Sequence, residues 1–511
     1  MATLAERDTT GTLTPGEGEV ELLDRRTRTA KVFNLGGRRR RIGATIGPIH
    51  YRHDPFDEQE GLKEIDLAVL LTPDEVWDAA CETNGYQVRL WQQREVAGRT
   101  VCYIAQFRRA GKWLAMAPVA LAWTNDAGDR QLISVPQAVG APTIDNNAGR
   151  VTWENVFGSG LHFRYNLVPD HFFKTLIVQS KASLPRPTIR PEGLCLTLVM
   201  ALSWHSEAAP TNGFAEGVTT DDLSGDPAAS ETPDEELENP EQFSFRDGVA
   251  RDLWWLRKPR AWDSYESEEG GPHTVAVDYR LRRKDSYVFA MFSVSATALN
   301  NAAVVYPVFL DVVIGEEQVG ASADDGFQYG SYPGTQTQEL ATSYIIVGAS
   351  TVQWHIGGWR FQAVPIPQGA AIDSAVMSVR CRTTRAYTAT WRCGAEDVDD
   401  AAEWSAEHKI GTHGYPARTT NYTDWDVGPW TAGTWYNTPD LSDVVEEVVG
   451  RGGWASNNDL NLMMWYPTEA HPESNEYENI SQWDENPAYG AKFNCSYTEP
   501  VSGGDWLFAS D

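Results

Sequence analysis

The sequence has few cysteines for its length, and they are scattered. Six occur among 511 residues, and no two of them form a CxxC pair. Zinc ribbons need such pairs and disulfide scaffolds need a dense set of cysteines, so neither is expected. We expect free thiols, most of them buried.

Long hydrophobic runs are also missing. The most apolar stretches, at 114–123 and 194–204, are shorter than the roughly 18 residues that span a bilayer, so no membrane insertion is expected. Residues 1–20 lack a basic start followed by an apolar core. We therefore expect no secretory signal peptide and a chain that is made in a cytoplasm.

Basic residues are scarce relative to acidic ones. The chain has 42 Lys and Arg against 71 Asp and Glu, which gives a formal net charge of -29. A surface with this balance repels the phosphate backbone of DNA and RNA. Nucleic acid is therefore excluded as an expected partner.

What the chain has in abundance is short runs rich in β-branched and aromatic residues. Examples lie at 29–35, 99–109 and 161–168, and Gly, Asn, Asp or Pro separates one run from the next. Many short strands with turn signals between them are typical of sandwiches and barrels. The sequence predicts an all-β protein, and at roughly 150 residues per domain it has the length of about three domains.

Changes of composition predict the division of the chain. Residues 207–241 hold eleven Asp or Glu and no Lys or Arg, which indicates a solvated segment. We expect a flexible arm at 1–20, an N-terminal β-rich domain at 21–205, an acidic linker or excursion at 206–245, further strands of the N-terminal region at 246–318, a C-terminal domain at 319–500 and a tail at 501–511.

One segment, TPDLSDVVEEVVGRGGW, has a helical pattern. Thr438 is expected to cap the helix, Pro439 to take its first position and Gly450 to end it. Four apolar residues at helical spacing predict the buried stripe: Leu441, Val444, Val445 and Val448.

Several stretches of the C-terminal region form a recognisable set. They are GASADDGFQYG, GGWRFQAVPIPQGAAIDSAVMSVRC, the segment from DWDVGPW to LNLMMWY, and AKFNCSYT. Together they resemble a jelly-roll module of bacteriophage tail or virion structural proteins, which also occurs in large secreted bacterial surface proteins of the Rhs-like or adhesin type. The resemblance covers most of 320–498 and implies a jelly-roll β-sandwich with one short helix.

The region before this module resembles the part that precedes it in surface and Rhs-like wall proteins. The resemblance rests on GPIHY, WENVFGSGLHFRYNLVPDHFFKTLIV and YPVFLDV, and it implies N-terminal regions of the β-sandwich type. Because the chain lacks a signal peptide, we expect a virion protein rather than a secreted one. Tail fibre, head fibre and capsid decoration protein all remain open.

Catalytic motifs are absent from the sequence. There is no GxSxG elbow, no GxxxxGK[ST] loop and no HExxH helix. Paired carboxylates for glycoside hydrolysis cannot be recognised among 71 acidic residues. We expect a protein that is not an enzyme and that has no cofactor beyond a structural calcium ion.

Two groups of residues are candidate metal ligands. Asp324 and Asp325 stand beside a glycine at the entry to a strand, where they are expected to bind Ca²⁺; the alternative is an Asx-turn. His50 and His53 with Asp54 form a second candidate, for which the alternative is a solvated strand edge.

An aromatic loop and a basic cluster are candidate binding surfaces. Flat rings stack on sugars and anchor interfaces, so we expect an exposed ligand-binding patch, with a buried core as the alternative, at Tyr422, Trp425, Trp430, Trp435 and Tyr436. The basic cluster is either a solvated turn or an assembly contact with a neighbouring subunit, and consists of Arg38, Arg39, Arg40 and Arg41.

These observations predict a structural protein of a bacteriophage particle that performs no catalysis. Its N-terminal part is expected to dock on the capsid or tail, and its C-terminal jelly roll to face outward for stabilisation or host attachment. The expected partners are other virion proteins, further copies of this chain and a host-surface glycan. The alternatives are a bacterial surface or secreted carbohydrate-binding protein and a hydrolase of surface glycans.

Overall fold

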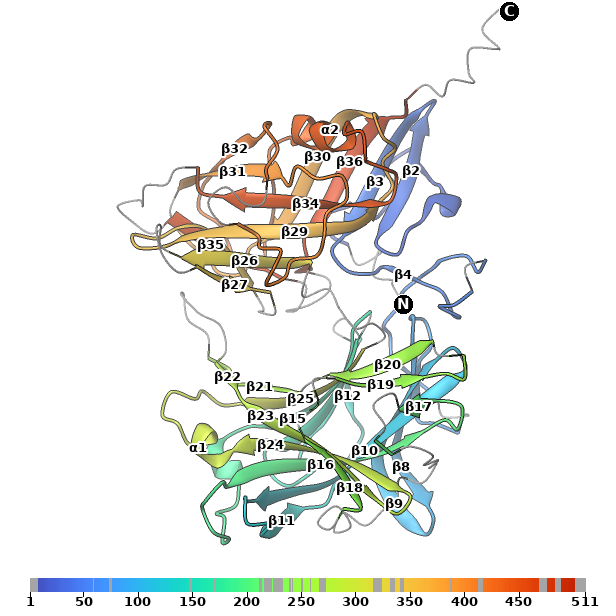
Figure 1. Ribbon diagram of the computed structural model, residues 1–511, viewed down its shortest axis with the longest axis vertical. Helices are drawn as coiled ribbons and strands as arrows, with labels where there is room; N and C mark the ends of the chain where they lie inside the picture. The colour runs from blue at the N-terminus through green and yellow to red at the C-terminus, as the bar shows by residue number, and fades with distance from the viewer. Residues whose placement is uncertain are drawn as a thin grey trace, which may run out of the picture. The chain divides into compact units, whose positions relative to one another are not determined.

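In a computed structural model of the chain, nearly all of the regular secondary structure is β-strand (Figure 1). The structure describes residues 8–500 except 58, 73–75, 147–148, 170, 211–213, 216–222, 224–232, 239, 241, 250, 258, 266–272, 316–323, 331–335, 341–343, 387, 412–416, 468–475 and 483–488. The all-β prediction is confirmed. All six cysteines are free thiols, and five of them are buried. Among the described residues, neither α-helix has the length and apolar character to cross a membrane.

The chain divides into two units instead of the three domains that its length suggested. Unit 1 comprises residues 52–60 and 66–318, and unit 2 comprises residues 2–51, 61–65 and 319–511. The last division falls between residues 318 and 319, where the sequence analysis placed the start of the C-terminal domain.

Unit 1 is built from two sheets of ten strands each. The first has the order β18 (Glu235–Glu238), β23 (Val277–Lys284), β24 (Tyr287–Ser295), β16 (Cys195–Trp204), β10 (Lys112–Thr124), β9 (Arg99–Arg109), β8 (Gln87–Val96), β7 (Ala79–Cys81) and β6 (Leu70–Leu71), with β11 (Arg130–Ser134) paired to β10. The second has the order β12 (Thr143–Asp145), β13 (Arg150–Trp153), β14 (Leu161–Leu167), β15 (His171–Val178), β25 (Val308–Gly315), β20 (Asp252–Arg257), β19 (Gln242–Arg246) and β17 (Ala209–Pro210), with β21 (Arg260–Trp262) paired to β25 and to β22 (Thr274–Val275). A short helix, α1 (Ala296–Leu299), follows β24, and a 3-10 turn, η2 (Lys181–Ser183), follows β15.

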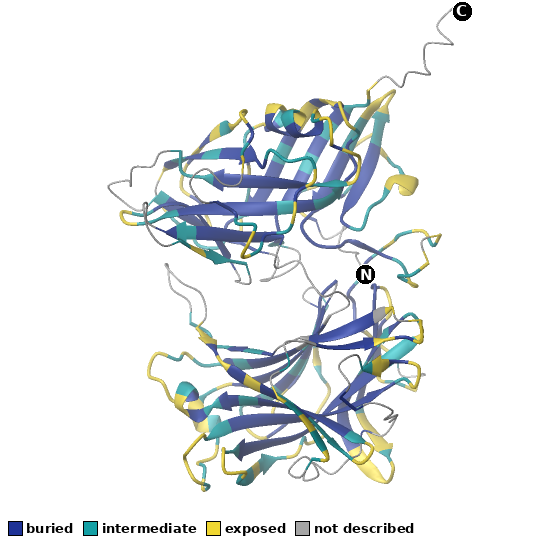
Figure 2. Cartoon of the chain, in the orientation of Figure 1, coloured by how far each residue is buried: buried dark blue, intermediate teal, exposed yellow. Residues whose placement is uncertain are grey.

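Aromatic side chains from the two sheets meet inside unit 1. Alternate residues of β14 are buried, as expected of a strand with one face on a core. The ring of Tyr103 on β9 lies 5.2 Å from that of Trp153 on β13, and the ring of Trp204 on β16 lies 5.3 Å from that of Phe245 on β19. Unit 1 is therefore a β-sandwich with an aromatic core, and buried residues line the inner faces of its strands (Figure 2).

Unit 2 is also a sandwich, of one six-stranded and one eight-stranded sheet. The first has the order β1 (Val20–Glu21), β2 (Ala30–Gly36), β3 (Arg39–Thr45), β36 (Lys492–Thr498), β30 (Ala371–Arg380) and β33 (Trp435–Asn437). The second has the order β27 (Gln336–Glu339), β26 (Asp325–Gly330), β29 (Trp354–Val364), β34 (Asn458–Trp465), β31 (Ala389–Ala395) and β32 (Thr423–Val427), with β28 (Tyr344–Ala349) paired to β29 and to β35 (Glu476–Ser481). A separate pair consists of β4 (His50–Tyr51) and β5 (Lys63–Glu64), and a 3-10 turn, η1 (Leu23–Arg25), follows β1.

The two sheets of unit 2 enclose one core. The rings of Phe361 on β29 and Phe493 on β36 lie 5.4 Å apart, and the buried Tyr497 hydroxyl donates a hydrogen bond to the Pro365 carbonyl at 3.1 Å. The predicted helix is present as α2 (Ser442–Val449), which contacts β30 of one sheet and β31 of the other.

The helix begins later than its sequence suggested. Asp440, rather than Thr438, serves the first turn, because its Oδ1 accepts a hydrogen bond from the Ser442 amide at 3.2 Å. The Thr438 hydroxyl instead accepts from the Met377 amide of β30 at 3.1 Å. The expected apolar stripe is confirmed, since its four residues are at most 1% exposed.

The first strands of the chain belong to unit 2, which corrects the predicted N-terminal domain at 21–205. β3 pairs with β36 along its whole length, from Arg39 opposite Thr498 to Thr45 opposite Lys492. The predicted arm at 1–20 is likewise packed where it is described: Asp8 lies 2.7 Å from the Lys492 ammonium. Pairing between the two ends of a chain leaves no local pattern, so the sequence could not reveal it.

Part of the predicted acidic excursion at 206–245 is an edge strand. Residues on β18 face basic residues on β23, with the Glu235 carboxylate 2.9 Å from Arg283 and the neighbouring Asp234 carboxylate 2.7 Å from Lys284. Opposite charges across an edge favour pairing, which explains why an acidic segment is ordered here. Most of the remaining residues of this segment lie outside those that the structure describes.

Candidate functional site

The antiparallel pair β31 and β32 in unit 2 has two faces of opposite character. Trp391 lies opposite Trp425, and the next pair along the strands is Thr390 opposite Asp426. Because successive side chains of a strand point to opposite faces, the tryptophans lie inside the sandwich and Thr390 and Asp426 lie outside. β32 also ends its sheet, so this outer face is at a sheet edge.

Polar side chains and one aromatic ring occupy the outer face. Thr390 Oγ1 donates a hydrogen bond to Asp426 Oδ1 at 2.7 Å, and Arg392 binds Asp424 through two nitrogens at 2.8 and 3.1 Å. The guanidinium carbon of Arg392 lies 3.7 Å from the centre of the Tyr422 ring, and Tyr422 is 49% exposed. These five residues are called the β31–β32 outer face below.

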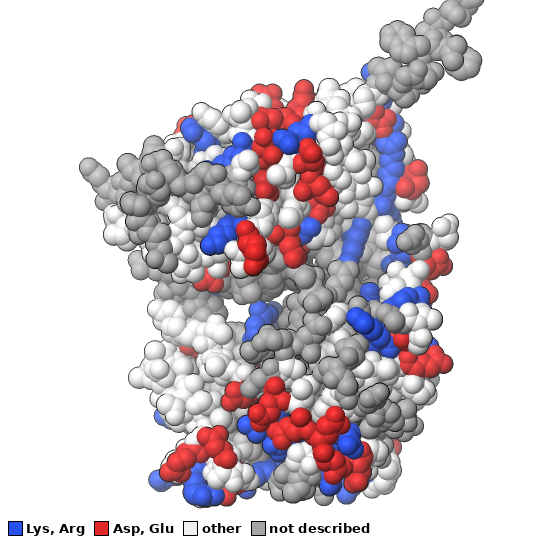
Figure 3. All heavy atoms as spheres, viewed as in Figure 1, with Lys and Arg blue, Asp and Glu red and all other residues white. Residues whose placement is uncertain are grey.

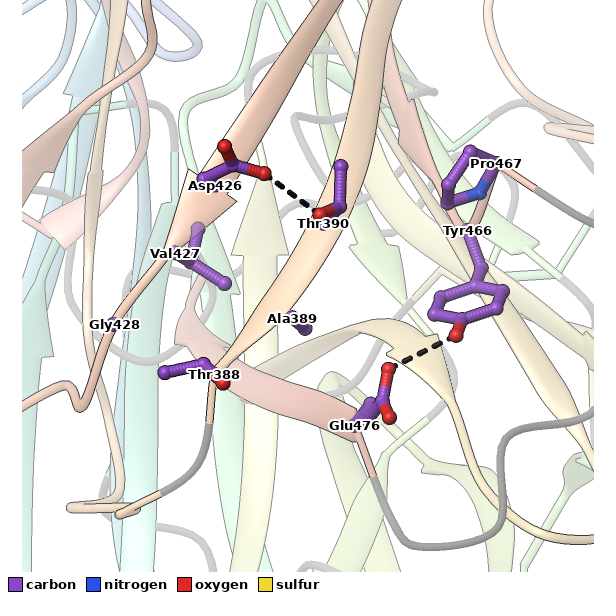
Figure 4. Close-up of a pocket in the computed structure, with 9 residues that line it drawn as sticks. All are labelled: Thr388, Ala389, Thr390, Asp426, Val427, Gly428, Tyr466, Pro467 and Glu476. Atoms are coloured by element: carbon purple, nitrogen blue, oxygen red, sulfur yellow. Dashed lines mark hydrogen bonds between the residues drawn. The ribbon is translucent and has the colours of Figure 1, made fainter.

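A hollow with a volume of ≈ 570 Å³ lies at one end of this face (Figure 4). It forms where β31 begins, β32 and β34 end, and β35 begins. Its lining consists of Thr388, Ala389, Thr390, Asp426, Val427, Gly428, Tyr466, Pro467 and Glu476.

Two hydrogen-bonded pairs of hydroxyl and carboxylate groups flank the hollow. One is Thr390 with Asp426, and the other is the Tyr466 hydroxyl, which points at Glu476 and donates to its Oε2 at 2.9 Å (Figure 4). Burial and the nearby Glu476 carboxylate raise the pKa of Tyr466 to about 12, so the phenol keeps its proton at neutral pH. Within the described residues, no donor is bonded to the other oxygen of either carboxylate. Each of these two oxygens can accept a hydrogen bond from a hydroxyl group of a ligand.

The predicted aromatic patch is wrong for two of its five members. Trp425 is 9% exposed and Trp430 is 2% exposed, and their rings lie 5.9 and 5.3 Å from that of the fully buried Trp391. Tyr436 stacks in parallel on Trp430 at 4.3 Å. The alternative interpretation as a core therefore holds for Trp425 and Trp430, because Trp425 points inward from β32 and Trp430, beyond the end of that strand, packs on Trp391.

Of the predicted five, Tyr422 alone is exposed. Trp435 and Tyr436 are half-buried, and the Lys492 ammonium lies 4.0 Å from the centre of the Trp435 ring. Tyr422 differs because it is in phase with Asp424 and Asp426, which point outward.

The basic cluster spans the end of the β2–β3 turn and the start of β3, and it is largely matched by acids of its own unit. Arg39 lies 3.4 Å from Asp373, and Arg40 lies 3.0 Å from Glu499. Arg41 lies 2.5 Å from Glu19. Arg38 is exposed on the turn itself. Such interleaving of charges is common on this protein's surface (Figure 3).

The two predicted calcium ligands are buried and bonded to protein groups. Asp324 accepts from Arg360 at 2.6 Å and from the Gln362 side chain at 2.7 Å. Asp325 Oδ1 accepts from the Gln482 side chain at 2.8 Å. A calcium ion would have to displace these donors, and its binding stays a prediction.

The predicted histidine group has one buried member. His50 is 1% exposed, and burial lowers its pKa to about 4, whereas His53 and Asp54 are exposed. A ring nitrogen of His50 lies within 4.8 Å of carboxylate oxygens of Glu21 and Glu64, two residues that the sequence analysis did not single out.

The hollow itself was missed from the sequence. The alternation in TDWDV was enough to place Asp424 and Asp426 opposite the tryptophan, as strand geometry requires. No local signal joins Tyr466 and Glu476 to them, because that meeting depends on which strands are neighbours.

Comparisons with known proteins give no family. No family model and no curated protein matches the chain. Among solved structures, an exo-β-1,3-galactanase from Phanerochaete chrysosporium is 7% identical, with 88% of this chain and 99% of that chain covered and a TM-score of 0.15. The Slr1438 protein from Synechocystis sp. PCC 6803 is 13% identical, with 59% and 96% covered and a TM-score of 0.15. A Paenibacillus xanthan lyase is 8% identical, with 94% and 55% covered and a TM-score of 0.13. Scores this low carry no argument about fold or function.

Proposed function

We propose that this chain is a binding protein without catalytic activity, and that its second unit recognises a neutral glycan on the β31–β32 outer face and in the adjoining hollow. One observation carries the proposal: an exposed aromatic ring and a row of carboxylates lie on one strand face that leads into a hollow lined by hydroxyls. Sugars have apolar ring faces and a rim of hydroxyl groups, so this combination is complementary to them.

Each group on the face has a distinct part in binding. The Tyr422 ring offers a flat apolar surface for stacking against a sugar ring. The second oxygens of Asp426 and Glu476 accept hydrogen bonds from sugar hydroxyls, and such bonds are stronger because the acceptors are charged. Arg392 is held by Asp424 and fixes the position of the tyrosine.

The charge of the site favours a neutral ligand. Asp424, Asp426 and Glu476 outnumber the single Arg392 among the charged residues of the face and hollow. The chain as a whole carries a formal net charge of -29. Both features repel glycans that carry carboxylate, sulfate or phosphate groups.

The positions of the perturbed acids support binding rather than catalysis. Burial raises the pKa of Asp311 to about 6, that of Asp324 to about 7 and that of Glu478 to about 8, values that suit a general acid. Yet each of the three is at most 3% exposed, and none of them lines the hollow. A general acid must reach its substrate, so these groups are poorly placed for glycan cleavage.

The setting that we propose for this binding is a bacteriophage particle. The sequence resemblance, which covers most of 320–498, supports it, and many copies on one particle would multiply a weak affinity for a host surface. Mass spectrometry of purified particles tests the setting: the chain is expected at a fixed copy number, and release from uninfected cells would overturn this part of the proposal.

Binding is tested with the full chain on immobilised neutral and acidic oligosaccharides, followed by calorimetry with the best neutral binder. We expect Tyr422→Ala and Asp426→Asn each to weaken binding by about tenfold or more. The first removes ring stacking on the sugar and the second removes a charged hydrogen-bond acceptor, and each of these contacts contributes roughly 1.5 kcal/mol. Tyr422→Phe is expected to retain most of the affinity because the ring remains.

Val352→Ala is the matched control, since Val352 is exposed in unit 2 and lies outside the face and the hollow. Unchanged affinity in the Tyr422→Ala and Asp426→Asn variants would overturn the assignment of the face. Cleavage of the bound oligosaccharide by the wild-type chain would overturn the claim that the protein is not an enzyme.

A further inference from the structure

Three side chains from separate elements of unit 2, none of them in the β31–β32 outer face or the hollow, lie close together. Glu21 ends β1, His50 begins β4 and Glu64 ends β5. One oxygen or nitrogen atom from each lies within 4.8 Å of the other two. An imidazole nitrogen and two carboxylate oxygens are a donor set that suits divalent transition metals such as zinc.

His50 is held in the tautomer that a metal ligand requires. Its Nδ1 lies 2.6 Å from the Thr27 carbonyl oxygen, so Nδ1 carries the proton and donates it. The Nε2 lone pair then has no hydrogen-bond partner among the described residues, although the side chain is almost completely buried. Metal-binding histidines commonly donate their second nitrogen to a carbonyl in this way.

A buried lone pair without a protein partner is unusual and costs free energy unless another group satisfies it. This observation is independent of the two glutamates. It indicates that something other than a protein group completes the site.

Two cations already neutralise the glutamates. Lys31 Nζ lies 2.7 Å from Glu64 and 3.5 Å from Glu21, and Arg26 lies 2.6 Å from Glu21 and 3.1 Å from Glu64. The Lys31 side chain is 5% exposed, so its ammonium lies between the carboxylates inside the protein. A metal ion between the same oxygens would compete with this ammonium group.

We propose that Glu21, His50 and Glu64 bind a divalent transition metal ion such as Zn²⁺, and that the Lys31 ammonium takes the place of the ion in the metal-free protein. The bound ion joins β1 to the β4–β5 pair. Binding to the folded state alone stabilises a protein by mass action, so the ion strengthens this part of unit 2.

The test is calorimetric titration of Zn²⁺ into the full chain after treatment with a chelator. We expect one site, a loss of affinity of about 100-fold or more in His50→Ala, and a gain of about tenfold or more in Lys31→Met, which removes the competing charge. Because Lys31→Met gains binding, a general loss of folding cannot imitate that result.

Absorption of bound Co²⁺ supplies a second measurement, since a nitrogen ligand in a site of low symmetry gives intense visible bands. His53→Ala is the matched control, because His53 is exposed and only three residues from His50. The proposal is overturned if His50→Ala binds Zn²⁺ as tightly as wild type, or if Lys31→Met binds no more tightly.

Discussion

The two faces of the β31–β32 pair differ in how they use their residues. Trp391 and Trp425 on the inner face pack against each other and against Trp430, which follows β32, and these rings are at most 9% exposed. The outer face carries Tyr422 and two charged carboxylates in water. The comparison shows that a single alternating segment supplies both a core and a candidate binding surface, so aromatic content alone does not indicate a binding patch.

Truncating one residue on each face is the most direct test of this difference between a buried and an exposed face. Trp391→Ala should lower the free energy of unfolding by about 3–5 kcal/mol, because it leaves a large cavity among packed rings. Thr390→Ala, its neighbour on the outer face, should lower it by less than about 1 kcal/mol. Urea denaturation followed by circular dichroism measures both, and equal losses would show that the outer face is also structural.

Ion pairs offer a second contrast between interior and surface. Arg360 is 15% exposed and lies 2.6 Å from Asp324 and 2.5 Å from Asp459, whereas the Asp424 partner of Arg392 is 44% exposed. Arg360→Ala should cost about 2–3 kcal/mol, because it leaves a buried carboxylate without its cation. Arg392→Ala should cost at most about 1 kcal/mol. A larger loss from Arg392→Ala in the same denaturation assay would reverse the contrast.

The smallest expected effect concerns pH at the end of β31. His408 Nε2 lies 2.7 Å from the buried carboxylate of Glu396, and this hydrogen bond raises the pKa of the histidine. A folded-state pKa above the unfolded value of about 6.5 means that the stabilisation is complete below that pH and is lost as the pH rises through the folded pKa.

The free energy of unfolding of wild type should therefore exceed that of His408→Gln most below about pH 6.5, and the difference should shrink at higher pH. Urea titrations between about pH 5.5 and pH 8.5 measure this dependence. Asp426→Asn on the outer face is the comparison variant. A difference between wild type and His408→Gln that stays constant with pH would contradict the assignment.

Local patterns predicted a large part of the fold. Short runs rich in β-branched and aromatic residues, such as 161–168, identified strands, and the spacing from Leu441 to Val448 identified the helix and its buried stripe. These features depend on neighbours within a few residues. The helix cap was misplaced by two residues, because Thr438 is bonded to β30, which lies far away in sequence.

The candidate sites were predicted less well. Tyr422 and His50 were singled out, but their partners were not. Asp426 and Glu476 in the hollow, and Glu21 and Glu64 beside His50, come from strands whose proximity no local pattern encodes.

The amino-acid sequence by itself determined that this protein is made of sandwiched β-strands with acidic surfaces, since runs of β-branched and aromatic residues and an excess of charge are properties of the chain itself. Only the tertiary structure decided that residues 39–45 pair with the C-terminal strand β36 and that the aromatic loop divides into a core and one exposed ring. The physical reason is that strand pairing is made by backbone hydrogen bonds, which are the same for every residue except proline. Which strands become neighbours is settled by how all the buried faces of a unit pack together.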